Sequence, residues 1–237
     1  MAGLAAKTDS APLDQTRAAR RHLLHVFASF GYGGVSIRIC DVINALPEGF
    51  RHTVVALDGC FDAGKRLAPH AAVDFRRLTL CKYNLPRSLA RVRALITAEA
   101  PDLLLTYNWG AIEVALANGL IGGCDHIHFE SGFRAEEGNG QLWRRNVFRH
   151  FALSRAKKLV VPSETLMSIA AKAWRIPADK LQQIPNGVDF LRYNGQPGKR
   201  ENPSLLADIH GARTAIGTVA PLRPEKNVGR LLRAFAA

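Results

Sequence analysis

The chain has 237 residues, of which 47% are hydrophobic and 22% charged, and its formal net charge is +12. This composition is ordinary for a globular protein, and the length allows one large domain or one domain and part of another. The positive charge favours an anionic partner, such as a phosphate-bearing substrate or an anionic membrane surface. No apolar run reaches 18 residues, so we expect no membrane-spanning helix.

The N-terminal residues and the cysteines both favour an intracellular protein. Residues 1–20 are polar and lack the apolar segment of a secretory signal, so we expect a loose tail there. The four cysteines lie far apart in sequence, without the short spacing of a metal site. We therefore expect reduced thiols, no bound metal and a cytoplasmic protein, either free or peripheral on the inner face of the membrane.

Short apolar runs alternate with helical patterns between residues 21 and 189. After the first run, His22–Phe27, apolar residues recur at helical spacing from Val35 to Leu46. Further strands are expected at His52–Leu57, Val73–Leu78, Leu103–Tyr107, His126–Glu130, Lys158–Val161 and Leu181–Ile184. Helices are expected at 85–96, Ala111–Asn118, Gln141–Arg155 and 163–173, with Asn84 and Ser163 as N-caps. This alternation predicts an α/β fold, a doubly wound parallel sheet of Rossmann-like type, over residues 21–189.

The composition changes after residue 189. Residues 190–212 are rich in Gly, Pro, Asn and charged residues, which is typical of a linker. Thr214–Val219 is then predicted to be a strand and Asn227–Ala236 a helix. Because one strand and one helix cannot enclose a core, we interpret residues 213–237 as the start of a truncated second Rossmann-like domain.

The loop after the first predicted strand contains Gly31, Gly33 and Gly34 and opens a helix. Glycines at this place let backbone N–H groups approach a phosphate or a sugar at the helix N-terminus. The spacing Gly31-x-Gly33-x-x-Ser36, with Asp58 ending the second strand, is also close to a dinucleotide fingerprint. A tight turn that needs positive φ at a glycine explains the same pattern equally well.

The fifth predicted strand ends in the polar sequence HFESG. Alternate residues of a strand point to the same side, so His128 and Glu130 share a face. At the carboxyl end of a parallel strand they would face the ligand crevice and could bind sugar hydroxyls or supply a general base. The alternative is a capped strand end with a structural histidine. His126 lies deeper on the same face and is expected to be structural.

Two later loops also carry candidate binding residues. Asn186, Gly187 and Asp189 form a turn after the last predicted strand, where Asn-Gly suits a positive φ. Arg223 and Lys226 place two cations before the last predicted helix, where they could hold a diphosphate or simply be solvated.

Residues 143–158 combine clustered Arg and Lys with apolar residues at helical spacing. Such a helix can lie on an anionic membrane surface, or it can be an ordinary surface helix with basic side chains. Nucleic acid is not expected as a partner, because the basic residues show no aromatic interleaving and no known binding module.

Taken in order, five motifs resemble family 4 glycosyltransferases of the GT-B architecture, which has two Rossmann-like domains. They are GGVS after the first strand, HFESG at the fifth, VPSE at 161–164, IPNGVD at 184–189 and GTVAPLRPEKN at 217–227. The resemblance covers nearly the whole chain from His22 onward. It implies retaining transfer of a sugar from a nucleotide diphosphate sugar, as co-substrate, to a hydroxyl of a glycan or lipid-linked acceptor, with no metal and no other cofactor.

The resemblance also implies roles for the candidate residues. They are Gly33 and Gly34 near the donor phosphates, His128 and Glu130 as catalytic residues lining the cleft, Asn186, Gly187 and Asp189 at the hinge, and Arg223 and Lys226 clamping the diphosphate. The family's paired donor-binding glutamates fall beyond residue 237, so we expect this chain by itself to be inactive or nearly so. Two alternatives stay open: a nicotinamide-dependent oxidoreductase and a non-catalytic binding remnant.

Overall fold

The structure is a computed structural model that describes residues 20–81, 84–132, 142–188, 216–220, 222 and 226–236. The described residues fall into two compact units, the larger ending at Asn186 and the smaller beginning at Gly187. Nearly all of the predicted tail and the whole predicted linker lie outside the described residues, as do Asp189 and Arg223.

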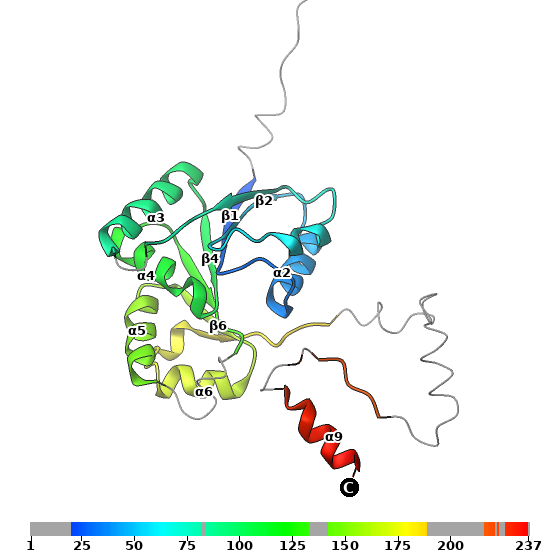
Figure 1. Ribbon diagram of the computed structural model, residues 1–237. Coiled ribbons are helices and arrows are strands. Elements are labelled where there is room, and N and C mark those ends of the chain that lie inside the picture. The colour runs from blue at the N-terminus through cyan, green and yellow to red at the C-terminus, as the bar shows by residue number, and fades with distance from the viewer. Residues whose placement is uncertain are drawn as a thin grey trace, which may run out of the picture. The chain divides into compact units, whose positions relative to one another are not determined.

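The larger unit is built on a parallel β-sheet (Figure 1). Its described strands are β1 Arg21–Phe27, β2 Phe50–Ala56, β3 Val73–Arg77, β4 Leu103–Tyr107, β5 His126–Phe129, β6 Lys158–Val161 and β7 Leu181–Gln183. They form one seven-stranded sheet in the order β3-β2-β1-β4-β5-β6-β7, and every neighbouring pair is parallel. The predicted doubly wound α/β fold is confirmed, and each strand agrees with its predicted range to within two residues at either end.

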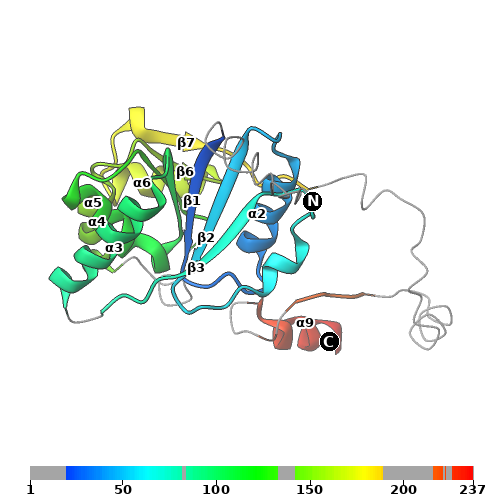
Figure 2. The same ribbon diagram turned by 90° about the horizontal axis from the view of Figure 1, so that it is seen from above.

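Helices cover both faces of this sheet. They are α2 Gly34–Ala45, η1 Asp62–Arg66, α3 Leu85–Glu99, η2 Trp109–Ala111, α4 Ile112–Ile121, α5 Trp143–Leu153, α6 Glu164–Lys172 and η4 Ala178–Lys180. Figure 2 shows α2 on one side of the sheet and α3, α4 and α5 on the other. Strand order reverses between β1 and β4, so the carboxyl ends of these two strands form the switch point at which ligands of such sheets bind.

The predicted helix caps are present. The Asn84 side chain accepts a hydrogen bond from the Arg87 amide at 3.0 Å, and Ser163 Oγ accepts one from the Leu166 amide at 3.3 Å. Each cap satisfies an amide that the first helical turn leaves without a partner. These ends of α3 and α6 are therefore set by local sequence.

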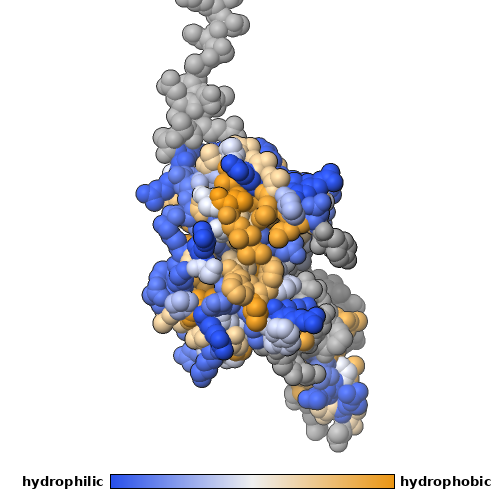
Figure 3. Space-filling model, turned by 90° about the vertical axis from the view of Figure 1, so that its left-hand side faces the viewer, coloured by the Kyte–Doolittle hydropathy of each residue, from blue (hydrophilic) through white to orange (hydrophobic). Residues whose placement is uncertain are grey.

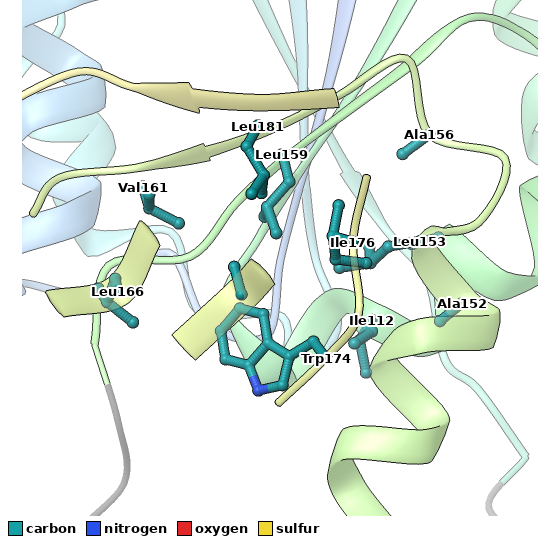
Figure 4. Close-up of a cluster of buried hydrophobic side chains, with 12 residues drawn as sticks. Ile112, Ala152, Leu153, Ala156, Leu159, Val161, Leu166, Trp174, Ile176 and Leu181 are labelled. Carbon is teal, nitrogen blue, oxygen red and sulfur yellow. The ribbon is translucent and has the colours of Figure 1, made fainter. Parts of the chain in front are cut away.

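Trp174, just after α6, is the largest fully buried side chain of the unit. It packs in a core that gathers apolar side chains from α4, α5, β6, α6 and β7 (Figure 4). A second core lies on the opposite face, between α2, η1 and the strands β1, β2 and β4. Packing on both faces explains why the central strand β4 (LLLTY) and the strand β6 (KLVV) are apolar at nearly every position.

The smaller unit contains the helix α9, Val228–Ala236, close to the predicted helix. The predicted strand Thr214–Val219 is not seen in its described part, because residues 216–220 have no strand structure. A strand needs a hydrogen-bonded neighbour, and none of the described strands pairs with this segment. Across the described part of the chain, no helix is both long and apolar enough to cross a bilayer.

Candidate functional site

Gly33 and Gly34 lie at the start of α2, directly after the β1 loop. Gly33 is the N-cap, no side chain caps this end of the helix, and the first turn carries no acidic residue. A Cβ atom built on either glycine meets no atom of the described residues within 4 Å, so both border space that these residues leave open. The amides of this helix end are of the kind that an anion or a sugar hydroxyl can approach. The ligand role itself stays a prediction.

The residues of the dinucleotide-like pattern are used within the loops. Asp58 Oδ1 accepts a hydrogen bond from the Cys60 amide at 2.8 Å, so the carboxylate closes a turn after β2. A Cβ on Gly31 would lie 3.2 Å from Cys60 Sγ, and Ser36 is buried in α2. This geometry accounts for Gly31, Ser36 and Asp58 without a dinucleotide.

Arg38 is the main residue that sequence reasoning missed. It lies one turn after Gly34 on α2, and its guanidinium donates to Ser131 Oγ at 3.0 Å and to Asn186 Oδ1. Burial lowers the pKa of Arg38 from its ordinary value. One cation thus joins α2 to the segments that follow β5 and β7, and it brings the predicted Asn186 into the same site. Its position one helical turn from the glycines was the available signal.

Asn108, at the carboxyl end of β4, adopts a strained backbone conformation with φ of 58° and ψ of 178°. Its amide donates to the Phe129 carbonyl at 2.7 Å, and its Oδ1 accepts from the Ser131 amide at 2.8 Å. These bonds hold Ser131 in place for Arg38. Strain of this kind persists where the surroundings impose it, and it is frequent at functional sites. The sequence indicated only a polar residue after a strand.

His128 and Glu130 were expected to face the ligand crevice. They are instead 0% and 1% exposed, so neither faces an open crevice. They point to the sheet face that α5 covers, and Arg149 reaches them from this helix, with its Nε 3.6 Å from Glu130 Oε2. His128 Nε2 lies 3.8 Å from the same oxygen. We call His128, Glu130 and Arg149 the β5–α5 cluster.

Aromatic rings and a hydroxyl complete the surroundings of this cluster. The Arg149 guanidinium lies 4.8 Å from the ring centre of Trp109 and 4.6 Å from that of Trp174. Thr106 Oγ1 is 2.7 Å from His128 Nδ1 and 2.7 Å from His126 Nε2. Burial lowers the pKa of His126 to about 3, which agrees with its predicted structural role.

Two predicted residues belong to the smaller unit, and their roles stay predictions. Gly187 and Lys226 are exposed and belong to the smaller unit. Among the residues that are described, no group of three or more His, Cys, Asp or Glu side chains could hold a metal ion. The site therefore consists of a helix N-terminus, a cation, two amide side chains and a hydroxyl, which suits a ligand with phosphate or hydroxyl groups.

Solved structures with the same architecture match at low identity. HepE (Alr3699) of Anabaena, solved with UDP and glucose, gives a TM-score of 0.67 at 18% identity, covering 92% of this chain and 58% of HepE. A glycosyltransferase from Rickettsia africae gives 0.57 at 16% identity, covering 80% and 50%. MnaA of S. aureus, solved with UDP, gives 0.52 at 15% identity, covering 80% and 51%. The chain thus spans between half and three-fifths of the length of these proteins.

The structural likeness shows the fold, which is that of the N-terminal half of GT-B glycosyltransferases. A search of the curated proteins gives no match. The family model described as "Glycosyl transferase 4-like domain" matches residues 33–187, from the glycines at the start of α2 to the turn after β7. This match covers more than half of the chain, and the chain therefore belongs to the glycosyl transferase 4-like domain family.

Proposed function

We propose that this chain supplies the acceptor side of a reaction that moves a sugar from a nucleotide diphosphate sugar to a hydroxyl of a glycan or lipid-linked acceptor. Family membership supports the reaction class, and the UDP and glucose bound to HepE support the donor class. The observation that carries the proposal is the polar site in which Arg38 joins Ser131 and Asn186 beside the open start of α2. The cation and amides offer groups for a phosphate, and the polar side chains offer groups for sugar hydroxyls.

The chemistry of sugar transfer explains why such a site needs fixed positive charge. As the glycosidic bond breaks, negative charge develops on the leaving nucleoside diphosphate. A guanidinium and helix N–H groups that are already in position stabilise this charge more in the transition state than in the ground state. Arg38 and the N-terminus of α2 are such groups, and Arg223 and Lys226 are proposed to add to them. Cations in this role take the place of a metal ion.

The burial of His128 and Glu130 changes the role that we propose for them. Glu130 immediately precedes Ser131, the residue that Arg38 contacts. The Glu130 amide also donates to the Val160 carbonyl at 3.0 Å, which fixes the chain at the end of β5. We propose that the buried side chains of His128 and Glu130 position the Ser131 segment from the α5 side of the sheet and do not contact the sugar.

The reaction class also weighs against the two alternatives. An oxidoreductase would leave the contact of Arg38 with Ser131 and Asn186 without a purpose, whereas Gly31 and Asp58 already have local roles in their loops. A binding remnant would bind ligand at the same edge, so ligand binding alone does not separate it from an enzyme. Because turnover by these 237 residues alone is not expected, binding is the first readout and sugar transfer the second.

The test is a thermal-shift panel on the full chain with UDP, GDP, NAD and buffer alone. We expect UDP or GDP to raise the melting temperature and NAD to have no effect. Arg38→Ala should abolish the shift, whereas Arg21→Ala, an exposed arginine at the amino edge of β1, should keep it. A shift with NAD alone, or a nucleotide shift that survives Arg38→Ala, would contradict the proposal. Efficient transfer from a nucleotide sugar by the chain alone would refute the expected inactivity.

A further inference from the structure

The outer face of α5 carries a row of exposed apolar side chains. Trp143, Val147 and Phe151 follow each other at intervals of four residues, and they are 69%, 45% and 63% exposed. Leu120 on the neighbouring helix α4 is 58% exposed as well. We call these four residues the α4–α5 ridge. Figure 3 shows the side of the larger unit that carries α3, α4 and α5, and a band of hydrophobic surface runs down it between hydrophilic flanks.

Positive charge borders the ridge. Helix α5 contains Arg144, Arg145, Arg149 and no Asp or Glu, and the exposed Arg155 follows it. The Arg144 guanidinium lies 5.6 Å from the ring centre of Trp143, so cation and aromatic ring share one surface. Arg145, by contrast, faces inward, 5.2 Å from the ring centre of Trp109. The exposed cations of this face are therefore at its border.

Among the described residues around this face, little negative charge opposes these cations. Helix α4 has a single acidic residue, Glu113, in its first turn. Asp125, after α4, lies 2.5 Å from Lys157 and is already paired with it. A partner with negative charge around an apolar interior complements such a surface.

This combination indicates what covers the ridge. A second copy of the chain would place the same arginines opposite one another, and like charges at an interface cost binding energy. A bilayer with anionic headgroups accepts apolar side chains below its surface and binds Arg at the headgroup level. Tryptophan favours the same interfacial depth.

We propose that the α4–α5 ridge, with Arg144 and Arg155 at its border, docks the protein on a bilayer that contains anionic phospholipid. The first turn of α5 lies at the sheet edge that carries the proposed site, because Arg145 packs on Trp109, which follows the carboxyl end of β4. Docking would hold that edge close to the lipid surface, where a lipid-linked acceptor presents its hydroxyl. The acceptor part of this inference rests on the proposed function, whereas membrane docking does not.

The experiment measures flotation of the full chain with vesicles of phosphatidylcholine and with vesicles of an equal mixture of phosphatidylcholine and phosphatidylglycerol. We expect binding to the anionic vesicles only, with a decrease as salt rises. The triple change Trp143→Ser, Val147→Ser and Phe151→Ser should weaken partitioning at least about tenfold. The matched control is Val42→Ser, an exposed apolar residue on α2, on the other face of the sheet.

A second pair of variants tests the charge. Arg144→Glu with Arg155→Glu should also weaken binding at least about tenfold, because two cations are replaced by anions near the headgroups. Lys65→Glu with Lys172→Glu makes the same change in net charge at exposed positions of η1 and α6, and should bind like the wild type. Circular dichroism of each variant establishes that it is folded, and Phe151→Ser alone serves if the triple variant is not.

Tryptophan fluorescence gives an independent readout. The chain has three tryptophans, and Trp143 is the most exposed, whereas Trp174 is fully buried. Anionic vesicles should therefore shift Trp143 emission to the blue and protect it from iodide quenching.

Three outcomes would overturn the proposal: no binding to anionic vesicles, undiminished binding by the folded ridge variant, or a dimer in sedimentation that the ridge variant loses while vesicles are not bound. The nucleotide thermal shift should be unchanged in the ridge variant. Failure of docking is thereby distinguished from failure of the proposed function.

Discussion

Polar side chains are buried in two regions of the larger unit, and the two regions are built differently. In the histidine network, formed by His25, His52 and Tyr107, His25 lies 2.8 Å from Tyr107 Oη and 3.0 Å from His52 Nδ1. All three groups can remain uncharged. In the β5–α5 cluster, a carboxylate and a guanidinium face each other at 3.6 Å, and Glu130 Oε2 has no hydrogen-bond partner among the described residues.

The difference teaches which region serves the fold and which serves the site. A buried neutral network in which groups bond one another satisfies its members and keeps β1, β2 and β4 in register. A buried ion pair stabilises a fold poorly, because removing two charges from water offsets their attraction. Glu130 of this ion pair directly precedes Ser131. We therefore infer that the pair positions the Ser131 segment and contributes little to the stability of the fold. The following predictions separate the two roles.

The largest effect is expected from Glu130→Ala. The change removes the anion beside the buried Arg149 guanidinium, and breaking a buried pair in this way costs about 3–5 kcal/mol of unfolding free energy. Urea unfolding measures the loss. Glu113→Ala removes an exposed carboxylate from α4 and is the matched control, with little change expected. A loss below that of an ordinary surface substitution would show that the ion pair is not a structural unit.

The histidine network should make stability depend on pH. Burial, followed by the charge of neighbouring histidines, lowers the pKa of His25 from 6.5 to about 3 and that of His52 to about 4. Below pH 6.5, His25 and His52 bind protons in the unfolded chain but stay neutral in the folded chain. The stability that is present above pH 6.5 is therefore lost as the pH falls toward 4. We expect a loss on the order of 2–4 kcal/mol at about pH 4.5.

Urea titrations at several pH values check this prediction. His52→Gln removes one of the two titrating groups and should flatten the pH dependence, whatever its effect at neutral pH. A stability that does not change between neutral pH and about pH 4.5 would mean that the network takes up protons in the folded state.

Thr106→Val tests the link between the β5–α5 cluster and the sheet. The threonine hydroxyl contacts His126 and His128, and the isosteric valine leaves a buried nitrogen of each ring without its hydrogen bond. We expect a loss of about 1–3 kcal/mol in urea unfolding. Thr53→Val is the counterpart beside the histidine network, where the hydroxyl contacts His22 and Glu99. If the two regions differ as proposed, only Thr106→Val also weakens the nucleotide thermal shift.

Local patterns were sufficient to predict the framework. Continuous apolar runs identified the strands, and Ser163 and Asn84 identified helix starts, because each signal lies within a few neighbouring residues. The strand of residues 214–219 was predicted from the same kind of run. Its described part has no strand structure, since strand formation depends on a pairing partner and not on the run alone.

The site was harder to predict because its contacts connect distant segments. Arg38 contacts Ser131 and Asn186, which follow it in the chain by 93 and 148 positions, respectively. No local sequence pattern indicates such a contact. His128 and Glu130 lie at the end of β5 with their side chains 3.8 Å apart. Their burial depends on Arg149, which in sequence resembles one more basic side chain on a surface helix. The rotation of α5 that turns Arg149 inward is a property of packing on Trp109 and Trp174.

The smallest effect, and the most local one, is expected at Asn108, where the strained backbone meets the site. Asn108→Gly loses the bond from the Ser131 amide but relieves the positive φ, so the two changes offset and stability should stay within about 1 kcal/mol of wild type. Asn108→Ala loses the same bond and keeps the strain, so it should be less stable than the glycine variant by about 1 kcal/mol. Urea unfolding of the pair isolates the strain, since both variants lack the side-chain bond. Equal stability of the two variants would mean that the backbone at β4 relaxes freely, and that Ser131 is held for Arg38 by the amide side chain alone.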